Sequence, residues 1–283
     1  MLRIVMDSAG DLPDGWAEEF DIDIIPINIQ FGEQTFLQGV DLSSADFYRI
    51  ARESGTIPKT SQPSPTQFVE FYRKVAEPGD TILSIHVTGK LSGTFASAEM
   101  AARQVKDEFQ VIPFDSYSGS AAMAYLCREA RRMERNGETR EDILQRLDFI
   151  RENVQIVLTL DTLEFARRSG RVKALQAALA SVLNLKAIIA LHEGVLDMAD
   201  KVRTRSRALE KTLKMIQDVF GNRLVNAAVV HSEDPDSALA LLDMVRSRLK
   251  CKDLIVTDLS ISVAANLGPG TVGIVAYPVE QER

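Results

Sequence analysis

Cysteine and histidine are scarce in this chain. Its 283 residues include two cysteines, Cys127 and Cys251, and three histidines, His86, His192 and His231. Two cysteines cannot build the disulfide framework of a small secreted domain, and no His and Cys cluster has the spacing of a metal site. We therefore expect a reduced, cytoplasmic setting, with no bound metal and no cofactor.

Basic residues and unbroken apolar runs are also limited. The chain has 33 Lys and Arg against 40 Asp and Glu, so its formal net charge is −7, which argues against a general affinity for nucleic acid. The longest apolar region, residues 174–191, is interrupted by Gln176, Asn184 and Lys186, and we do not expect it to span a membrane. An acidic residue, Asp7, comes too early for the core of a signal peptide.

Strand-like and helix-like segments alternate through the first half of the chain. Short apolar runs predict strands at residues 2–7, 24–31, 82–87 and 111–114. Amphipathic segments with capping residues predict helices at residues 44–53, 65–75, 94–102, 119–136 and 140–152. This alternation predicts a mainly parallel sheet with helices on both faces.

From residue 154 the pattern mixes hairpins with crossovers. It predicts strands at residues 155–160, 187–191, 195–204, 225–230, 254–258 and 272–276, and helices at residues 163–169, 172–183, 205–220 and 235–250. We therefore predict an α/β fold in two domains. Residues 1–153 would form an α/β/α three-layer domain with a mainly parallel sheet, and residues 154–283 a smaller α/β domain with a mixed sheet.

The loop after residues 82–87 is the stretch that points most directly to a ligand. In an open α/β sheet this loop lies at the carboxyl end of its strand, and the following helix presents unpaired N–H groups and a partial positive charge. Ser92 and Thr94 add hydroxyl donors, and Gly93 lets a ligand approach the backbone closely. The loop predicts a site for a small anionic group. The alternative is an ordinary serine N-cap.

Other predicted loops carry short polar side chains as well. Asp7, Asp115 and Ser116 follow strands, and Thr60 lies in a proline-rich extended loop. Turn and cap formation explains each of these residues singly. The alternative function is an enzyme acting on a small carboxylated or phosphorylated substrate, with Asp7, Asp11 and Asp115 as acid, base or metal ligands.

Two common catalytic motifs are incomplete. Gly89 lies one position too far from Ser92 for a G-x-S-x-G nucleophile elbow, and His86 precedes that serine on the same strand. Residues 55–60 lack the first glycine of a P-loop and place Pro58 where a backbone donor is needed. Neither serine hydrolysis nor nucleotide hydrolysis is favoured.

Two basic clusters interrupt the acidic sequence, at residues 167–171 and 201–207. Solvated charge is the commoner explanation of such clusters. An arginine near the mouth of a pocket would instead bind an anionic head group with two parallel hydrogen bonds.

Six short motifs, in order along nearly the whole chain, resemble those of the DegV family. They are Asp7–Leu12 (family D-S-x-x-D-L), Pro58–Ser64 (P-x-T-S-Q-P-S), Leu91–Thr94 (L-S-G-T), Asp115–Ser116 (D-S), Ser169–Arg171 (G-G-R) and Gly268–Gly270 (G-P-G). One such tetrapeptide is a weak signal, whereas six in order are specific. The resemblance implies a protein similar to the studied members of this family, which are fatty-acid-binding subunits of bacterial fatty-acid kinases.

The resemblance implies that a long acyl chain, such as palmitate, stearate or oleate, lies in a buried apolar tunnel. By position, Thr60 and Ser92 would hold its carboxylate, with Ser61 nearby and Arg171 and Arg203 at the mouth. The lipid-binding residues implied by the remaining motif positions are Gly93, Thr94, Asp115, Ser116 and Asn266. A partner kinase would transfer a phosphoryl group from ATP to the bound carboxylate, so the chain itself would not be an enzyme. The resemblance is also compatible with a transient contact with a membrane.

The closing motif departs from the family pattern. Many members have H-T-G-P-G, with a histidine at the pocket entrance that is associated with phosphorylation of the lipid, whereas residues 266–270 read N-L-G-P-G. The amide of Asn266 donates a hydrogen bond but cannot carry positive charge or shuttle a proton. Two alternatives follow: a subunit that presents lipid to a kinase, or a lipid chaperone that works without one.

Overall fold

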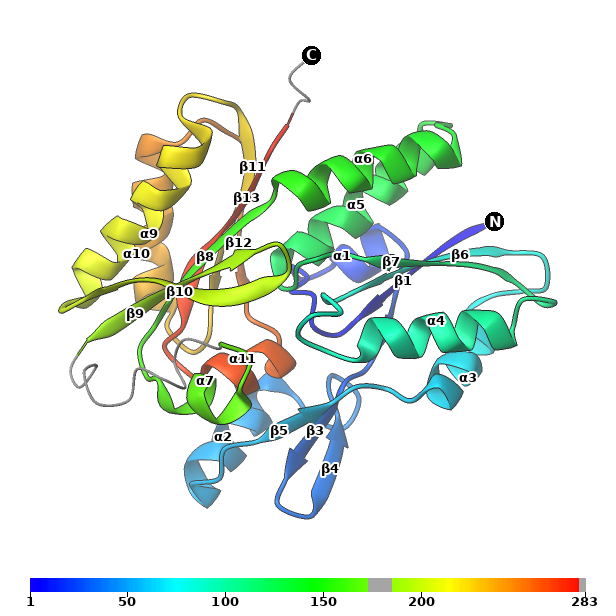
Figure 1. Cartoon of the computed structure of the whole chain (residues 1–283), viewed down its shortest axis with the longest axis horizontal. Helices are drawn as coiled ribbons and strands as arrows, with labels where there is room; N and C mark the ends of the chain where they lie inside the picture. The colour runs from blue at the N-terminus through cyan, green and yellow to red at the C-terminus, as the bar shows by residue number, and fades with distance from the viewer. Residues whose placement is uncertain (173–184, 280–283) are drawn as a thin grey trace. The chain divides into compact units, whose positions relative to one another are not determined.

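The computed structural model of the chain describes residues 1–172 and 185–279 (Figure 1). It divides into two compact units, Met1–Asp148 with Ser260–Ser262, and Phe149–Leu259 with Val263–Arg283. The first change of unit lies inside helix α6 (Arg140–Asn153). The domain boundary expected after residue 153 stays a prediction.

The first unit is built on a parallel sheet with the strand order β2-β1-β6-β7. Its strands are β1 (Leu2–Asp7), β2 (Ile22–Ile25), β6 (Thr81–His86) and β7 (Gln110–Asp115). The two central strands, β1 and β6, are mostly apolar and almost fully buried, because helices cover both faces of the sheet. Since parallel strands end at the same edge, the loops after β1, β6 and β7 are neighbours there.

Helices α3 (Pro65–Val75) and α4 (Thr94–Gln104) cover one face of this sheet, and α5 (Ala121–Arg135) covers the other (Figure 1). Val5 and Ile82 of the strands pack against Phe68 of α3 and Ala98 of α4. Ser64 is the N-cap of α3 and Pro65 is its first residue, in agreement with the helix predicted at residues 65–75. A short helix, α1 (Trp16–Glu19), was not expected.

Three antiparallel strands form a second sheet in the first unit, in the order β4-β3-β5. They are β3 (Asn28–Phe31), β4 (Gln34–Leu37) and β5 (Lys59–Ser61), and α2 (Ser44–Ser54) lies between β4 and β5 in the sequence. The single strand predicted at residues 24–31 is wrong. Pro26, which lacks an N–H group, separates β2 from β3, and the two strands belong to different sheets.

The second unit contains a six-stranded mixed sheet in the order β10-β9-β8-β13-β11-β12. Its strands are β8 (Gln155–Leu160), β9 (Lys186–His192), β10 (Val195–Val202), β11 (Val225–His231), β12 (Cys251–Asp258) and β13 (Val272–Pro278). Only β11 and β12 pair in parallel; the other pairs are antiparallel. Glu193 and Gly194 both have positive φ in the predicted β9–β10 hairpin, as a two-residue turn requires.

Helices α9 (Arg205–Phe220) and α10 (Pro235–Arg248) pack on this sheet through a buried core that includes Leu213, Ile216, Leu241 and Val245. The unit also contains α7 (Glu164–Ser169) and most of α11 (Ile261–Leu267), of which α11 was not expected. The helix predicted at residues 172–183 lies outside the described residues except for its first position.

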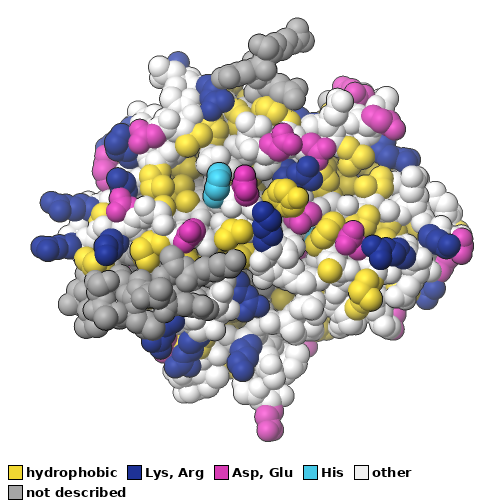
Figure 2. Space-filling view, in the orientation of Figure 1, with side chains coloured by type: hydrophobic (Ala, Val, Ile, Leu, Met, Phe, Trp, Pro, Cys, Tyr) yellow, Lys and Arg dark blue, Asp and Glu magenta, His cyan; other side chains and the backbone are white. Residues whose placement is uncertain are grey.

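The predicted fold class is confirmed: the first unit has a parallel sheet and the second has a mixed one. Within residues 1–172 and 185–279, helices fall short of the length and apolar character needed to cross a bilayer. On the face shown in Figure 2, acidic, basic and hydrophobic side chains are interspersed.

Candidate carboxylate site

The loop between β6 and α4 leads into the N-terminus of α4. The N-cap residue of this helix makes no side-chain hydrogen bond to the first turn. The N-cap residue is Gly93, one position after Ser92, which would be the N-cap in the alternative interpretation of this loop. The Ser92 hydroxyl lies 2.9 Å from the Thr94 hydroxyl and accepts the Thr94 N–H at 3.3 Å. The next N–H groups of the first turn have no intrahelical acceptor, so they and the helix dipole favour an anion.

Thr60 lies on β5, opposite Ile29 of β3, and is half-buried. The loop after it ends in a capping box. The Ser64 hydroxyl accepts the Gln67 N–H at 3.2 Å, and Gln67 Oε1 accepts the Ser64 N–H at 2.8 Å. This reciprocal pair fixes the point where the Thr60 loop enters α3.

Gln62 brings the Thr60 loop against the Ser92 loop. A Cβ atom added at Gly93 would lie 2.8 Å from Gln62 Nε2, so the glycine backbone and the glutamine side chain are in contact. Ser61 is exposed between Thr60 and Gln62, and its carbonyl accepts a hydrogen bond from Asn28 Nδ2 at 3.3 Å. The structure thus places two of the predicted motifs side by side.

Asp7 is a buried support of the Ser92 loop. Its Oδ1 accepts the Ala9 N–H at 2.9 Å, and its Oδ2 accepts the Val87 N–H at 2.9 Å. The side chain has no exposed surface. The carboxylate therefore ties the loop after β1 to the loop after β6.

Asp115 and Ser116 support the same region from the end of β7. Asp115 Oδ2 accepts the Gly89 N–H at 3.1 Å, and Oδ1 accepts the Tyr117 N–H at 2.9 Å. The buried Ser116 hydroxyl donates to the Ser118 carbonyl at 3.2 Å. These contacts hold loops together, and a direct contact of either side chain with a ligand stays a prediction.

Asp11 binds a part of the first unit that lies far from it in the sequence, Ser260–Ser262. Its Oδ1 accepts the Ser260 N–H at 2.8 Å, and its Oδ2 accepts the Ser120 hydroxyl. Ser262 adds a hydrogen bond to the Ser8 carbonyl at 3.2 Å. No sequence signal pointed to this contact between residues 249 positions apart.

The three aspartates of the alternative enzyme thus each accept hydrogen bonds from neighbouring N–H or O–H groups. Within the described ranges, His, Cys, Asp and Glu side chains form no group of three or more that could hold a metal ion. Both ring nitrogens of His86 lie within hydrogen-bond distance of Asp7 or Ser84, so this histidine does not act as a base for Ser92.

A buried chain of polar side chains, missed by sequence reasoning, starts at this histidine. His86 Nδ1 lies 3.0 Å from Asp7 Oδ2, and His86 Nε2 lies 2.7 Å from Ser84 Oγ. Ser84 Oγ lies 2.9 Å from the hydroxyl of Tyr72 on α3. The available signal was two polar residues, two positions apart, in an apolar strand, because such residues share a face.

The other three predicted residues belong to the second unit. Arg171 donates from Nη1 to the Ser169 carbonyl at 2.5 Å, and its N–H donates to Ser169 Oγ at 3.3 Å. Arg203 is exposed between β10 and α9, and Asn266 is half-buried near the end of α11. Their contact with a ligand stays a prediction.

The G-P-G motif forms a tight turn after α11. Gly268 and Gly270 have φ values of 90° and 73°, and a Cβ atom at Gly270 would lie 2.5 Å from Asp161 Cβ. The Gly270 N–H donates to the Ser232 carbonyl at 2.7 Å, and the Thr271 hydroxyl donates to the Gly268 carbonyl at 2.8 Å. Glycine is required here by both conformation and space.

Arg205 holds this turn from α9. Its Nη2 donates to the Gly270 carbonyl at 2.8 Å and to Asp234 Oδ2 at 2.6 Å. Burial alone would raise the pKa of the Asp234 carboxyl, but hydrogen bonds from Ser237 and the nearby Arg205 guanidinium hold that pKa below its usual value. The sequence favoured solvated charge for residues 201–207. This interpretation is wrong for Arg205, because its side chain is partly buried and binds Asp234 and the Gly270 carbonyl.

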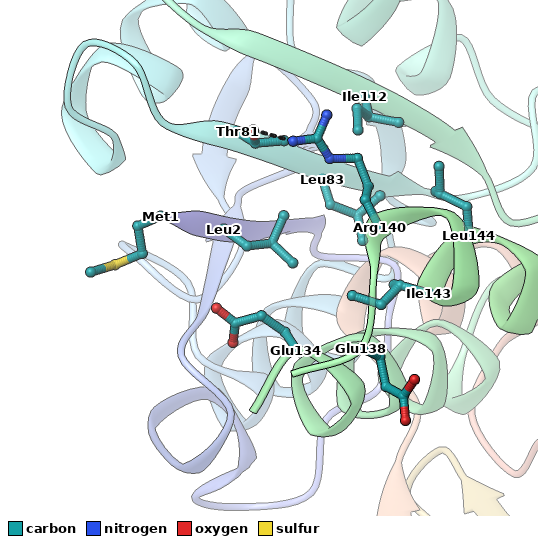
Figure 3. Close-up of a pocket in the computed structure, with 10 residues that line it drawn as sticks. All are labelled: Met1, Leu2, Thr81, Leu83, Ile112, Glu134, Glu138, Arg140, Ile143 and Leu144. Atoms are coloured by element: carbon teal, nitrogen blue, oxygen red, sulfur yellow. Dashed lines mark hydrogen bonds between the residues drawn. The ribbon is translucent and has the colours of Figure 1, made fainter. Parts of the chain in front are cut away.

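A separate cavity of about 230 Å³ lies at the other end of the parallel sheet, where strands β1 and β6 begin (Figure 3). Its aliphatic walls come from Leu2, Leu83, Ile112, Ile143 and Leu144. Arg140 at its rim donates to Thr81 Oγ1 at 3.3 Å and to Gln110 Oε1 at 2.8 Å, and Glu134 pairs with Arg131 at 2.9 Å. Because these charged groups already bind neighbouring side chains, the cavity is a poor candidate for a carboxylate site.

Comparisons with known proteins agree with the motifs. The sequence model described as "Uncharacterised protein, DegV family" matches residues 1–279. A curated relative, the fatty acid-binding protein of Thermotoga maritima, is 30% identical over 288 aligned residues, which cover 100% of this chain and 99% of the relative.

Solved structures are similar over the same length. A fatty-acid-binding DegV family protein from Thermus thermophilus is 31% identical, with a TM-score of 0.90 and coverage of 98% of this chain and 99% of that one. DegV of Bacillus subtilis, described as a fatty acid binding protein, is 26% identical, with a TM-score of 0.84 and coverage of 98% and 99%.

Proposed function

The chain belongs to the DegV family, and we propose that it binds one long-chain fatty acid, with the carboxylate held by Thr60 and Ser92. Relatives described as fatty-acid-binding proteins match it nearly end to end, which supports the proposal. Palmitate, stearate or oleate would be suitable ligands.

The observation that carries the proposal is the contact between Gln62 and Gly93. It puts the Thr60 and Ser92 segments next to each other at the N-terminus of α4, where N–H and O–H donors are available to an anion. A carboxylate there would accept charge-assisted hydrogen bonds without any lysine or arginine.

The acyl chain would supply most of the affinity. Burying a chain of about sixteen carbons, at about 0.8 kcal/mol per methylene, contributes on the order of 10 kcal/mol before the costs of ordering. The hydroxyls would fix the orientation of the head group and exclude apolar molecules that lack an acid.

We further propose that the bound carboxylate is presented to a fatty-acid kinase, which transfers a phosphoryl group to it from ATP. In this role the chain positions the lipid and is not itself an enzyme. Arg171, Arg203 and Asn266 stay proposed lipid-binding residues, and Asn266 would offer a neutral donor in place of the family histidine. A cytoplasmic site of action, with transient contact with a membrane, fits this role.

Mass spectrometry of lipid extracted from the purified native protein tests the binding. We expect a long-chain fatty acid, and recovery of no acyl chain, together with no uptake of added palmitate, would count against the proposal. In calorimetry with palmitate, Thr60→Ala and Ser92→Ala should each weaken binding by about 1 to 3 kcal/mol, the scale of one lost charge-assisted hydrogen bond.

Ser247→Ala is the matched control for these variants, because it removes an exposed hydroxyl that donates only to the Met244 carbonyl of its own helix. Unchanged palmitate affinity in both Thr60→Ala and Ser92→Ala would refute the carboxylate assignment.

A further inference from the structure

Asp7 has no exposed surface, and its carboxylate lies within hydrogen-bond distance of three donors. Oδ1 accepts the Ala9 N–H, and Oδ2 accepts the Val87 N–H while lying 3.0 Å from His86 Nδ1. Because backbone N–H groups only donate, both Asp7 oxygens act as acceptors. His86 must therefore carry its ring proton on Nδ1 to make the third hydrogen bond.

That proton position determines the direction of the next two bonds. If Nδ1 carries the only ring proton, His86 accepts at Nε2, and the Ser84 hydroxyl donates to it across the 2.7 Å contact. Ser84 Oγ then accepts from the Tyr72 hydroxyl at 2.9 Å. Burial raises the pKa of Tyr72, so this hydroxyl keeps its proton. In this tautomer the hydrogen bonds run one way, from Tyr72 to Asp7.

The hydrogen-bonded row of Tyr72, Ser84, His86 and Asp7 connects the segments that build the candidate carboxylate site. Tyr72 belongs to α3, which begins where the Thr60 loop ends. Val87, whose N–H is held by Asp7, is the first residue of the loop that leads from β6 to Ser92. A change at Asp7 would release this end of the Ser92 loop.

We propose that Asp7 is a positioning residue for Ser92: its carboxylate, oriented by His86, Ser84 and Tyr72, fixes the backbone at Val87 and so places the Ser92 hydroxyl and the N-terminus of α4. The inference rests on the proposed binding of a fatty acid and adds how the head-group site is held in shape.

Asp7→Asn tests this, because an amide of the same size can accept on one side only. Either the Ala9 or the Val87 N–H then faces an NH₂ group. By calorimetry at a temperature where both proteins are folded, we expect palmitate affinity to fall about tenfold. The control is Tyr277→Phe, which removes a buried hydroxyl that accepts from Asn226 Nδ2 at 2.8 Å in the second unit and should change affinity by less than about twofold.

A double-mutant cycle separates positioning from general destabilisation. If Asp7 acts through Ser92, Asp7→Asn should lower affinity by less than about threefold in a Ser92→Ala background. An equal loss in both backgrounds, or no loss in the wild-type background, would overturn the inference while the proposed function stands. A wild-type chain that binds no palmitate would overturn both.

Nuclear magnetic resonance of ¹⁵N-histidine-labelled wild-type protein needs no variant. The chain has three histidines, so the His86 signals can be assigned by single substitutions at the other two. We expect His86 to be protonated on Nδ1, and a proton on Nε2 instead would overturn the inference, even if Asp7→Asn does not fold.

Discussion

Gly93→Ala is the sharpest test of the contact between the Thr60 and Ser92 loops. Gly93 has a φ of −77°, which alanine adopts without strain, so the steric contact is the main perturbation. The new Cβ would lie 2.8 Å from Gln62 Nε2 and 3.1 Å from its Cδ, whereas ordinary contacts begin at 3.4 Å. The amide nitrogen must therefore retreat by about 0.6 Å, from 2.8 to 3.4 Å, and the Cδ atom by about 0.3 Å.

Gln62 is exposed, so it can retreat without disturbing the core. We expect the free energy of unfolding to change by less than about 1 kcal/mol. Binding is more sensitive, because a site holds its ligand only while its groups stay within about 0.5 Å of their working positions. Palmitate affinity should fall roughly three- to tenfold, which corresponds to about 0.6 to 1.4 kcal/mol.

Calorimetry with palmitate and thermal unfolding of the same samples measure the two effects. Gln62→Ala removes the Cγ, Cδ and Nε2 atoms that the new Cβ would meet, so Gly93→Ala should have little effect in that background. A loss of affinity that is the same with and without the Gln62 side chain would show that the two loops do not act through this contact.

Two further predictions concern the second unit. Asp234→Asn should lower the stability of the fold at neutral pH and flatten the dependence of stability on pH. Although burial opposes ionisation, hydrogen bonds from Ser237 and the charge of Arg205 depress the pKa of Asp234 in the folded chain. The ionised carboxylate therefore stabilises the fold above the unfolded pKa of about 4, and this stabilisation is lost as the pH falls through the lower folded pKa. Thermal unfolding at pH 7 and pH 3 checks this, and identical pH profiles would contradict it. Asn266→His should increase acyl-phosphate formation with a fatty-acid kinase and ATP, measured by trapping with hydroxylamine, because an imidazole can carry positive charge; a wild type as active as the variant would show that the histidine is not needed.

Local chemistry made much of the fold predictable. Apolar runs identified β1 and β6, and the Ser64 and Pro65 pair identified the start of α3, because each signal lies within the element that it specifies. The single strand predicted across Pro26 is wrong because its signal is not local. The residues on both sides of Pro26 are apolar, but the chain is divided there by the sheet that each half joins.

The candidate site was only partly predictable, because several of its contacts link residues far apart in the chain. Thr60 and Ser92 are candidates proposed from the sequence, but the sequence did not indicate the Gln62 contact with Gly93, which requires two loops to meet. It gave Asp7 a possible catalytic role, whereas the observed partners are Val87 and His86, which lie about 80 residues away. Side-chain pairing at that separation leaves no periodic signal in one sequence.

The electrostatics of the site explain why its hydroxyls should set orientation more than affinity. Asp7 and Asp115 turn their carboxylate oxygens toward backbone N–H groups of the Ser92 loop, and this stabilises the loop while adding negative charge to its surroundings. A ligand carboxylate at Ser92 would therefore gain from neutral donors and the α4 dipole, and would be opposed by two nearby anions. A short carboxylate has no apolar surface to offset that repulsion, whereas a long acyl chain does. Because a short and a long carboxylate meet the same repulsion, it lowers both affinities alike, and selectivity for long chains would come from burial of the acyl chain.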